Sequence, residues 1–90
     1  MAHKRQRTYD EMKLAHRSRL IAYMQDLCRI EAELWSIEFA KLRRFMHDVG
    51  AGPFLEPILF DMKEEGLLNY DVPITRGALI YLTPKWKGGS

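Results

Sequence analysis

The sequence predicts an α+β domain that is mainly helical and ends in a β-hairpin. The chain has 90 residues, of which 47% are hydrophobic and 29% charged, and this suits one folded domain rather than two. Between Tyr9 and Val49 there is no Pro or Gly, and apolar residues recur at spacings of three and four, as on a helix. The last third of the chain turns to strand-like composition on both sides of a turn at Pro73–Gly77. We therefore expect three helices, the first of them extended, followed by two strands.

The first helix should begin at Thr8. The stretch 8–11, TYDE, is a capping-box pattern, in which the Thr8 hydroxyl and the Glu11 carboxylate each accept the other residue's backbone N–H. One helix of about forty residues would be long for a small domain, so a break is expected near Ser36, the best internal N-cap. The spacing thus predicts a first helix to about Leu34 and a second from about Ile37 to His47.

Two glycines mark the limits of the third helix. Gly50 can take the left-handed position that ends the second helix, and Pro53 suits a first helical turn. A third helix is therefore expected from about Pro53 to Glu65, with Pro57 as an alternative start and Gly66 as its end. The two strands expected after it are residues 67–72 and 78–83, which form the hairpin.

Charge is divided unevenly along the chain, although the net charge is only +2. Residues 1–20 carry a net charge of +4, whereas residues 51–66, which hold the third helix, carry −3. Residues 1–7 show no apolar periodicity and are expected to form a basic flexible arm. Residues 87–90 are expected to be a flexible tail, which leaves residues 8–86 as the folded domain.

Several classes of function are disfavoured by the composition. Cys28 is the single cysteine, which allows no intramolecular disulfide, favours the reducing cytoplasm and suggests an inert core thiol. No apolar run approaches the roughly 18 residues that span a bilayer, and no signal-peptide core follows the basic start. His3, His16 and His47 lack metal-ligand spacing, and no catalytic constellation or phosphate loop is present. We expect neither a cofactor nor a metal, and a protein that is not an enzyme.

Two segments carry a family resemblance: residues 62–68, MKEEGLL, and residues 79–85, LIYLTPK. Over about residues 20–85, the order of elements and these motifs resemble winged helix-turn-helix transcription regulators. In that family the third helix commonly ends in two acids, a Gly, a Leu and an aliphatic residue, and the second strand of the wing often reads aromatic, aliphatic, Thr. The resemblance implies a DNA-binding regulator, with the third helix in the major groove and the wing on the backbone.

The third helix departs from the family pattern in its charge. It carries Glu56, Asp61, Glu64 and Glu65 against one cation, Lys63, and carboxylates are repelled by DNA. Contacts with double-stranded DNA are therefore expected from the arm, the second helix and the wing. The residues with that expected role are Lys4, Arg5, Arg7, Lys13, Arg17, Arg43, Arg44, Arg76 and Lys85. A solubilising terminus and a solvated helix face remain the alternatives for the arm and for the second helix.

Two hypotheses of function stay open. The first is a DNA-binding transcriptional regulator, expected to be a homodimer in which the long first helix presents an apolar seam to a second copy. The second is a protein-interaction module, such as an antiactivator, an adaptor or a phage-type inhibitor, that docks through its acidic and apolar third helix. The residues expected at such a protein interface are Tyr9, Phe54 and Leu55.

Overall fold

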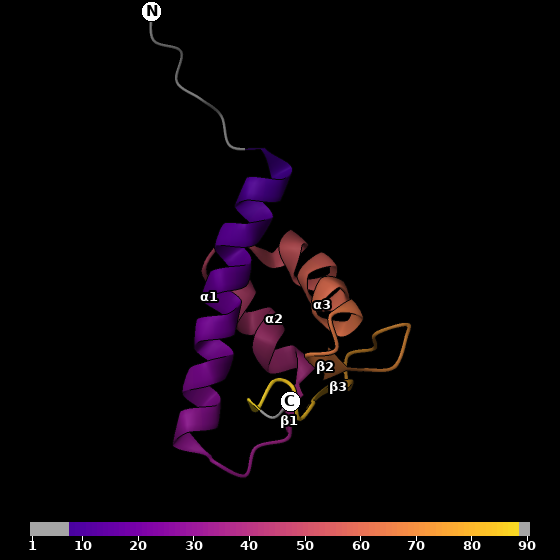
Figure 1. Ribbon diagram of the computed structural model, residues 1–90. Helices are drawn as coiled ribbons and strands as arrows, with labels where there is room; N and C mark the ends of the chain where they lie inside the picture. Colours follow the sequence, from indigo (N-terminus) through magenta and orange to yellow (C-terminus); the bar gives the residue numbers. More distant parts are fainter. Residues whose placement is uncertain (1–7, 89–90) are drawn as a thin grey trace, which may run out of the picture.

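The computed structural model describes residues 8–88 and shows three helices beside a small antiparallel sheet (Figure 1). The elements in chain order are α1 (Tyr9–Ile30), β1 (Ser36–Glu38), α2 (Phe39–Asp48), a 3-10 turn η1 (Gly52–Phe54), α3 (Leu55–Glu64), β2 (Leu68–Asn69) and β3 (Leu79–Leu82). The strand order in the sheet is β1-β3-β2 and both pairs are antiparallel, so β3 lies in the middle. The protein is therefore an α+β domain, as expected.

The first helix begins where the sequence predicts and ends earlier. The Thr8 hydroxyl accepts the Glu11 N–H at 3.2 Å, and the Glu11 carboxylate accepts the Thr8 N–H at 3.3 Å, which completes the capping box. The predicted end at Leu34 is wrong, because α1 stops at Ile30 and Glu31 is extended, with φ −128° and ψ 94°. The chain turns there so that the next residues can enter the sheet.

The strand β1 occupies the place where a helix N-cap was expected. Ser36 is not a cap: it lies in β1 opposite Tyr81, and Ile37 lies opposite Ile80. The following helix has no side-chain cap, and the N–H of its first residue, Phe39, donates to the Ala78 carbonyl at 3.0 Å. A contact from a distant part of the chain thus replaces the local cap. The expected two-stranded hairpin, β2 and β3, is confirmed but belongs to a three-stranded sheet.

The two glycines close their helices as predicted. Gly50 has φ +73° and Gly66 has φ +80°, both in the left-handed region. After each glycine, the next N–H donates back to the carbonyl five residues earlier, at 2.7 and 3.0 Å, which is the Schellman pattern. The α3 helix itself begins at Leu55, because Pro53 lies in the preceding 3-10 turn η1.

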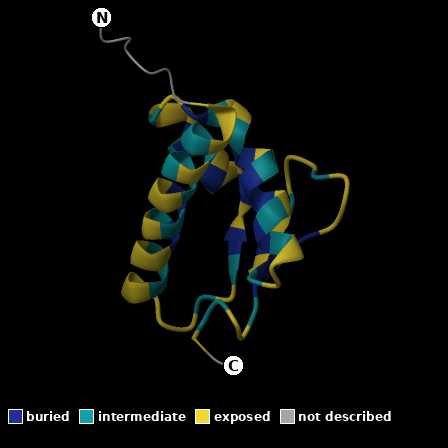
Figure 2. Ribbon diagram, turned by 45° about the horizontal axis from the view of Figure 1, so that its top comes forward, coloured by how far each residue is buried: buried dark blue, intermediate teal, exposed yellow. Residues whose placement is uncertain are grey.

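The core lies between the three helices and the inner face of the sheet. In the ribbon of Figure 2, α1 is coloured mostly exposed or intermediate. The core consists of Leu20, Met24, Ile37, Phe39, Leu42, Met46, Ala51, Leu55, Ile58, Leu59, Met62, Leu68, Tyr70, Ile80 and Leu82. Each large apolar side chain buried in this way stabilises the fold by about 1.5–3 kcal/mol. The four core residues of α3 form one stripe along that helix, so the opposite stripe of α3 faces solvent.

Candidate interaction surfaces

Two cations of α1 form ion pairs with Asp61 of α3 and with Glu65, the C-cap residue of that helix. The Lys13 ammonium lies 2.6 Å from the Asp61 carboxylate. Arg17 donates to Glu65 from both terminal guanidinium nitrogens, one of them at 2.6 Å, in a bidentate pair. The two pairs are one turn apart on both helices and join them. Lys13 and Arg17 were expected to contact DNA, and the structure instead shows both cations engaged in ion pairs within the protein.

The pKa values of these groups follow from their pairing. The pKa of the Glu65 carboxyl is lowered, mainly by the hydrogen bonds from Arg17 and then by the charges of Arg17 and Lys85. The pKa of Lys13 is raised, mainly by its hydrogen bond with Asp61, and that of Arg17 by its hydrogen bond with Glu65. The Arg17–Glu65 pair is therefore charged at neutral pH. Half of the acids that seemed wrong for the third helix have a structural role.

Lys85 is also engaged within the fold. Its ammonium donates to the Glu65 carbonyl at 2.7 Å, at the C-terminal end of α3. The Thr83 hydroxyl donates to the neighbouring Gly66 carbonyl at 2.6 Å. A cation at this end of a helix interacts favourably with the helix dipole. Lys85 thus stabilises the junction between α3 and the sheet. This contact explains its position without a DNA phosphate.

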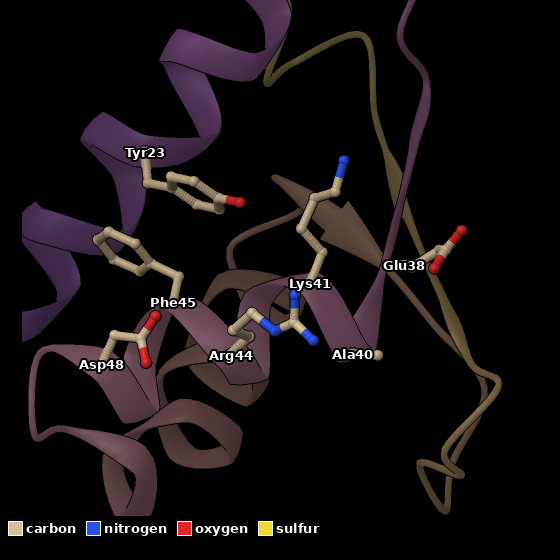
Figure 3. Close-up of a pocket in the computed structure, with 7 residues that line it drawn as sticks. All are labelled: Tyr23, Glu38, Ala40, Lys41, Arg44, Phe45 and Asp48. Atoms are coloured by element: carbon tan, nitrogen blue, oxygen red, sulfur yellow. The ribbon is translucent and has the colours of Figure 1, made fainter.

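An exposed cluster of cations remains on α2, and we call Lys41, Arg43 and Arg44 the α2 basic surface. Among residues 8–88, none of the three has a salt bridge. Lys41 and Arg44 border a hollow of about 430 Å³ between α1 and α2, where the rings of Tyr23 and Phe45 stack at 4.2 Å (Figure 3). The same hollow is lined by Glu38 and Asp48, so negative charge flanks this surface.

The other predicted DNA contacts lie in two places. Arg76 is exposed in the loop between β2 and β3, next to Gly77, and has no ion pair in the described part of the chain. The arm residues Lys4, Arg5 and Arg7 lie outside the described residues. Of the predicted set, Arg43, Arg44 and Arg76 are therefore the described cations that are exposed and unpaired.

A second surface lies on the solvent side of α3, next to the loop that follows β2. We call it the α3 groove, a hollow of about 450 Å³ lined by Lys13, Glu56, Pro57, Phe60, Asp61, Tyr70, Val72, Pro73 and Ile74. Phe60 is 53% exposed and Val72 is 69% exposed, both high values for large apolar side chains. Glu56 and Glu64 lie one helical turn before and after Phe60 on the same exposed stripe. The groove is thus apolar in its lining and acidic along α3.

The single cation of α3 does not offset the charge of this groove. The Lys63 ammonium donates to the Tyr70 carbonyl at 2.9 Å and lies 4.8 Å from the centre of the Tyr70 ring. The pKa of the Tyr70 hydroxyl is raised, mainly by burial and then by the charges of Glu56, Asp61 and Glu64. The direction of these charge effects indicates a negative potential along the groove.

None of the three residues predicted at a protein interface, Tyr9, Phe54 and Leu55, lines the α3 groove. Leu55 is only 2% exposed and belongs to the core, so its expected role at an interface is corrected. Tyr9 stacks on Phe54 with ring centres 5.2 Å apart, where α1 packs on η1. Sequence reasoning missed Phe60, although a signal was present. Phe60 falls outside the buried stripe of α3 and lies four residues from a glutamate on each side.

The described residues show little that suggests another kind of site. Within residues 8–88 there is no group of three or more His, Cys, Asp and Glu that could hold a metal ion. Cys28 is free and half-buried, and its sulfur accepts the indole N–H of Trp86 at 3.5 Å. None of the helices in this range has an apolar stretch long enough to cross a membrane. Comparison with protein-family models, curated proteins and solved structures finds no significant match to the chain.

Proposed function

We propose that this domain binds a protein partner through the α3 groove. The observation that carries the proposal is that Phe60 of α3 and Val72 of the loop after β2 line one groove and are 53% and 69% exposed. Exposed apolar side chains gathered in a concave surface with a charged rim are typical of protein-binding sites. An aromatic side chain near the centre of such a surface commonly contributes much of the binding energy.

The order of elements supports a winged-helix fold for this module. The α3 helix leads through Gly66 directly into β2, which pairs with β3, and the loop between these strands takes the place of the wing. In a regulator of that family, α3 would enter the major groove. Here its exposed stripe carries Glu56 and Glu64, whose carboxylates repel DNA phosphates, and Phe60, which has no charge to bind them. The exposed stripe of α3 is therefore better suited to binding a protein than to binding DNA.

Selection from a displayed library of random peptides of about twelve residues tests this proposal. The immobilised wild-type domain should retain a set of peptides, and a Phe60→Ser variant should lose them because the apolar wall of the groove is removed. Phe60 lies outside the core, so the variant should keep its fold. Leu14→Ser is the matched control, because Leu14 is 63% exposed on α1.

The readout of the selection is peptide binding to the three proteins, measured by fluorescence anisotropy. Equal affinity for the wild type and Phe60→Ser would contradict the proposal, because the bound surface would then lie elsewhere. Loss of binding in Leu14→Ser but not in Phe60→Ser would likewise place the interface on α1.

Binding to double-stranded DNA through the α2 basic surface is a second candidate function. It is favoured by Lys41, Arg43 and Arg44, which are exposed and have no salt bridge among residues 8–88. Together with Arg76 and the arm, these cations would contact phosphates, while α3 stays off the duplex. In this role the protein would be a small transcriptional regulator.

A titration of a duplex of about 20 base pairs at about 50 and 200 mM salt tests this candidate. Binding should weaken steeply with salt, and the double variant Arg43→Ala/Arg44→Ala should lower the salt slope by about two. The control Arg19→Ala/Arg29→Ala removes two exposed cations of α1 and should leave the slope nearer to the wild-type value. An absence of binding at low salt, or equal effects of the two double variants, would contradict it. Light scattering on the free protein would report twice the chain mass for the expected homodimer.

A further inference from the structure

We infer that the partner segment held in the α3 groove is cationic, with Lys or Arg residues flanking one bulky apolar anchor. The inference deepens the proposed function and rests on the α3 groove being a docking site. It concerns the chemistry of the occupant, which the exposure of apolar side chains alone does not define. The charges along the groove indicate which charge the occupant should carry.

The carboxylates along the groove are not neutralised within the described part of the chain. Glu56 and Glu64 are exposed, and neither has a salt bridge among residues 8–88. Asp71, between Tyr70 and Val72 in the adjoining loop, is likewise exposed and unpaired there. These acids are therefore available to pair with cations of a partner, and they flank the apolar lining from two elements.

The nearby cations are committed to other contacts. Lys13 lies at the edge of the groove and is held 2.6 Å from Asp61. Lys63 is held by the Tyr70 carbonyl at 2.9 Å and by the Tyr70 ring. Neither cation can turn to Glu56 or Glu64 without breaking its present contact. Complementary charge on a partner would steer its approach and select it over acidic competitors.

The lining of the groove favours recognition through side chains. Pro57 and Pro73 both line it, and proline has no backbone N–H to donate. A strand-like partner would therefore find few main-chain donors there. Phe60, Val72 and Ile74 offer apolar surface, and a hollow of about 450 Å³ accepts a bulky side chain. A segment with an apolar anchor between flanking cations would fill the apolar hollow and pair with the acids along it.

Other occupants fit the groove less well. A nucleic acid would place its phosphates against Glu56 and Glu64. A second copy docked groove to groove would bring identical acidic rims together, because a two-fold interface pairs each patch with itself. A cationic peptide meets neither objection.

The closing experiment uses the peptides that the wild-type domain retains from the displayed library. We expect Lys and Arg to be enriched around one apolar position, and binding of the tightest peptide to weaken as salt rises. The variant Glu56→Gln/Glu64→Gln should bind that peptide about fivefold more weakly, as expected for two rim charge pairs. The control Glu31→Gln/Glu33→Gln changes two exposed acids that follow α1 directly in the chain, and it should bind the peptide as the wild type does. Thermal unfolding verifies that all variants keep the fold.

The outcomes separate this inference from the proposed function. Peptides that require Phe60 but are not cationic, and that are insensitive to salt and to Glu56→Gln/Glu64→Gln, would overturn the inference and leave the docking site standing. Peptides that bind Phe60→Ser as well as the wild type, or no retained peptides at all, would overturn both. Self-association of the free domain that Phe60→Ser abolishes would make the occupant a second copy and overturn the inference.

Discussion

Arg17 and Glu65 illustrate how single residues divide the charge of this protein between folding and recognition. The bidentate pair holds the C-terminal end of α3 against α1, and Lys13 with Asp61 does the same one turn earlier. Asp61 and Glu65 are therefore acids of the fold, whereas Glu56 and Glu64 remain exposed and available. The excess negative charge on the third helix is thus made of two groups with different roles.

The pairing of Glu65 predicts a specific dependence of stability on pH. The pKa of Glu65 is lower in the folded protein than its ordinary value of 4.5, so its contribution is present above that pH and is lost as the pH falls through the folded pKa. We expect Glu65→Gln to lower the free energy of unfolding by up to about 1 kcal/mol at pH 7, since the pair is partly exposed. The difference from the wild type should shrink as the pH is lowered from 7 to about 3 in urea titrations. Glu64→Gln is the control, because Glu64 has no salt bridge in the part of the chain that the structure describes. An equal loss for Glu65→Gln at both pH values would contradict the assignment.

At the scale of elements, the ends of the helices follow from local chemistry. The glycine that ends α3, Gly66, has φ +80°, and an added Cβ would meet only the Lys85 side chain at 3.9 Å. Gly66→Ala should therefore lower the free energy of unfolding by about 1 kcal/mol through backbone strain alone. Gly77→Ala is the matched control, because Gly77 has no positive φ and nothing within 4 Å of an added Cβ. Chemical denaturation of the two variants checks this, and equal effects would show that the left-handed conformation is not what matters.

The features that the sequence could predict depend on contacts between neighbours in the chain. The features that it could not predict depend on contacts between distant segments. The capping box at Thr8 and the glycine caps were predictable because each involves neighbours in the chain. The strand β1 was not, since three residues carry little pattern and its pairing with β3 joins segments more than forty residues apart. The ion pairs of Lys13 and Arg17 also depend on the packing of α1 against α3. Exposure of Arg43 and Arg44 was predictable, because helical periodicity places them off the buried face of α2.

At the scale of the whole molecule, the domain presents two surfaces of different chemistry on two helices. The α3 groove is apolar with an acidic rim, and the α2 basic surface carries cations that have no salt bridge within residues 8–88. No residue is shared between the α3 groove and the hollow beside the α2 basic surface. A protein partner on the groove would therefore leave the basic surface open, so the two candidate functions are physically compatible.

The central claim, that the α3 groove is the docking site, is tested most directly by mapping amide chemical shifts. The labelled domain is titrated with the tightest selected peptide, and with the DNA duplex in a parallel sample. If the α3 groove is the docking site, the peptide will shift the amides of Phe60 and its neighbours on α3, together with those of residues 70–72 and 74. The amides of Lys41–Arg44 will then remain unchanged. Peptide-induced shifts confined to α2, or spread over the whole domain, would contradict it.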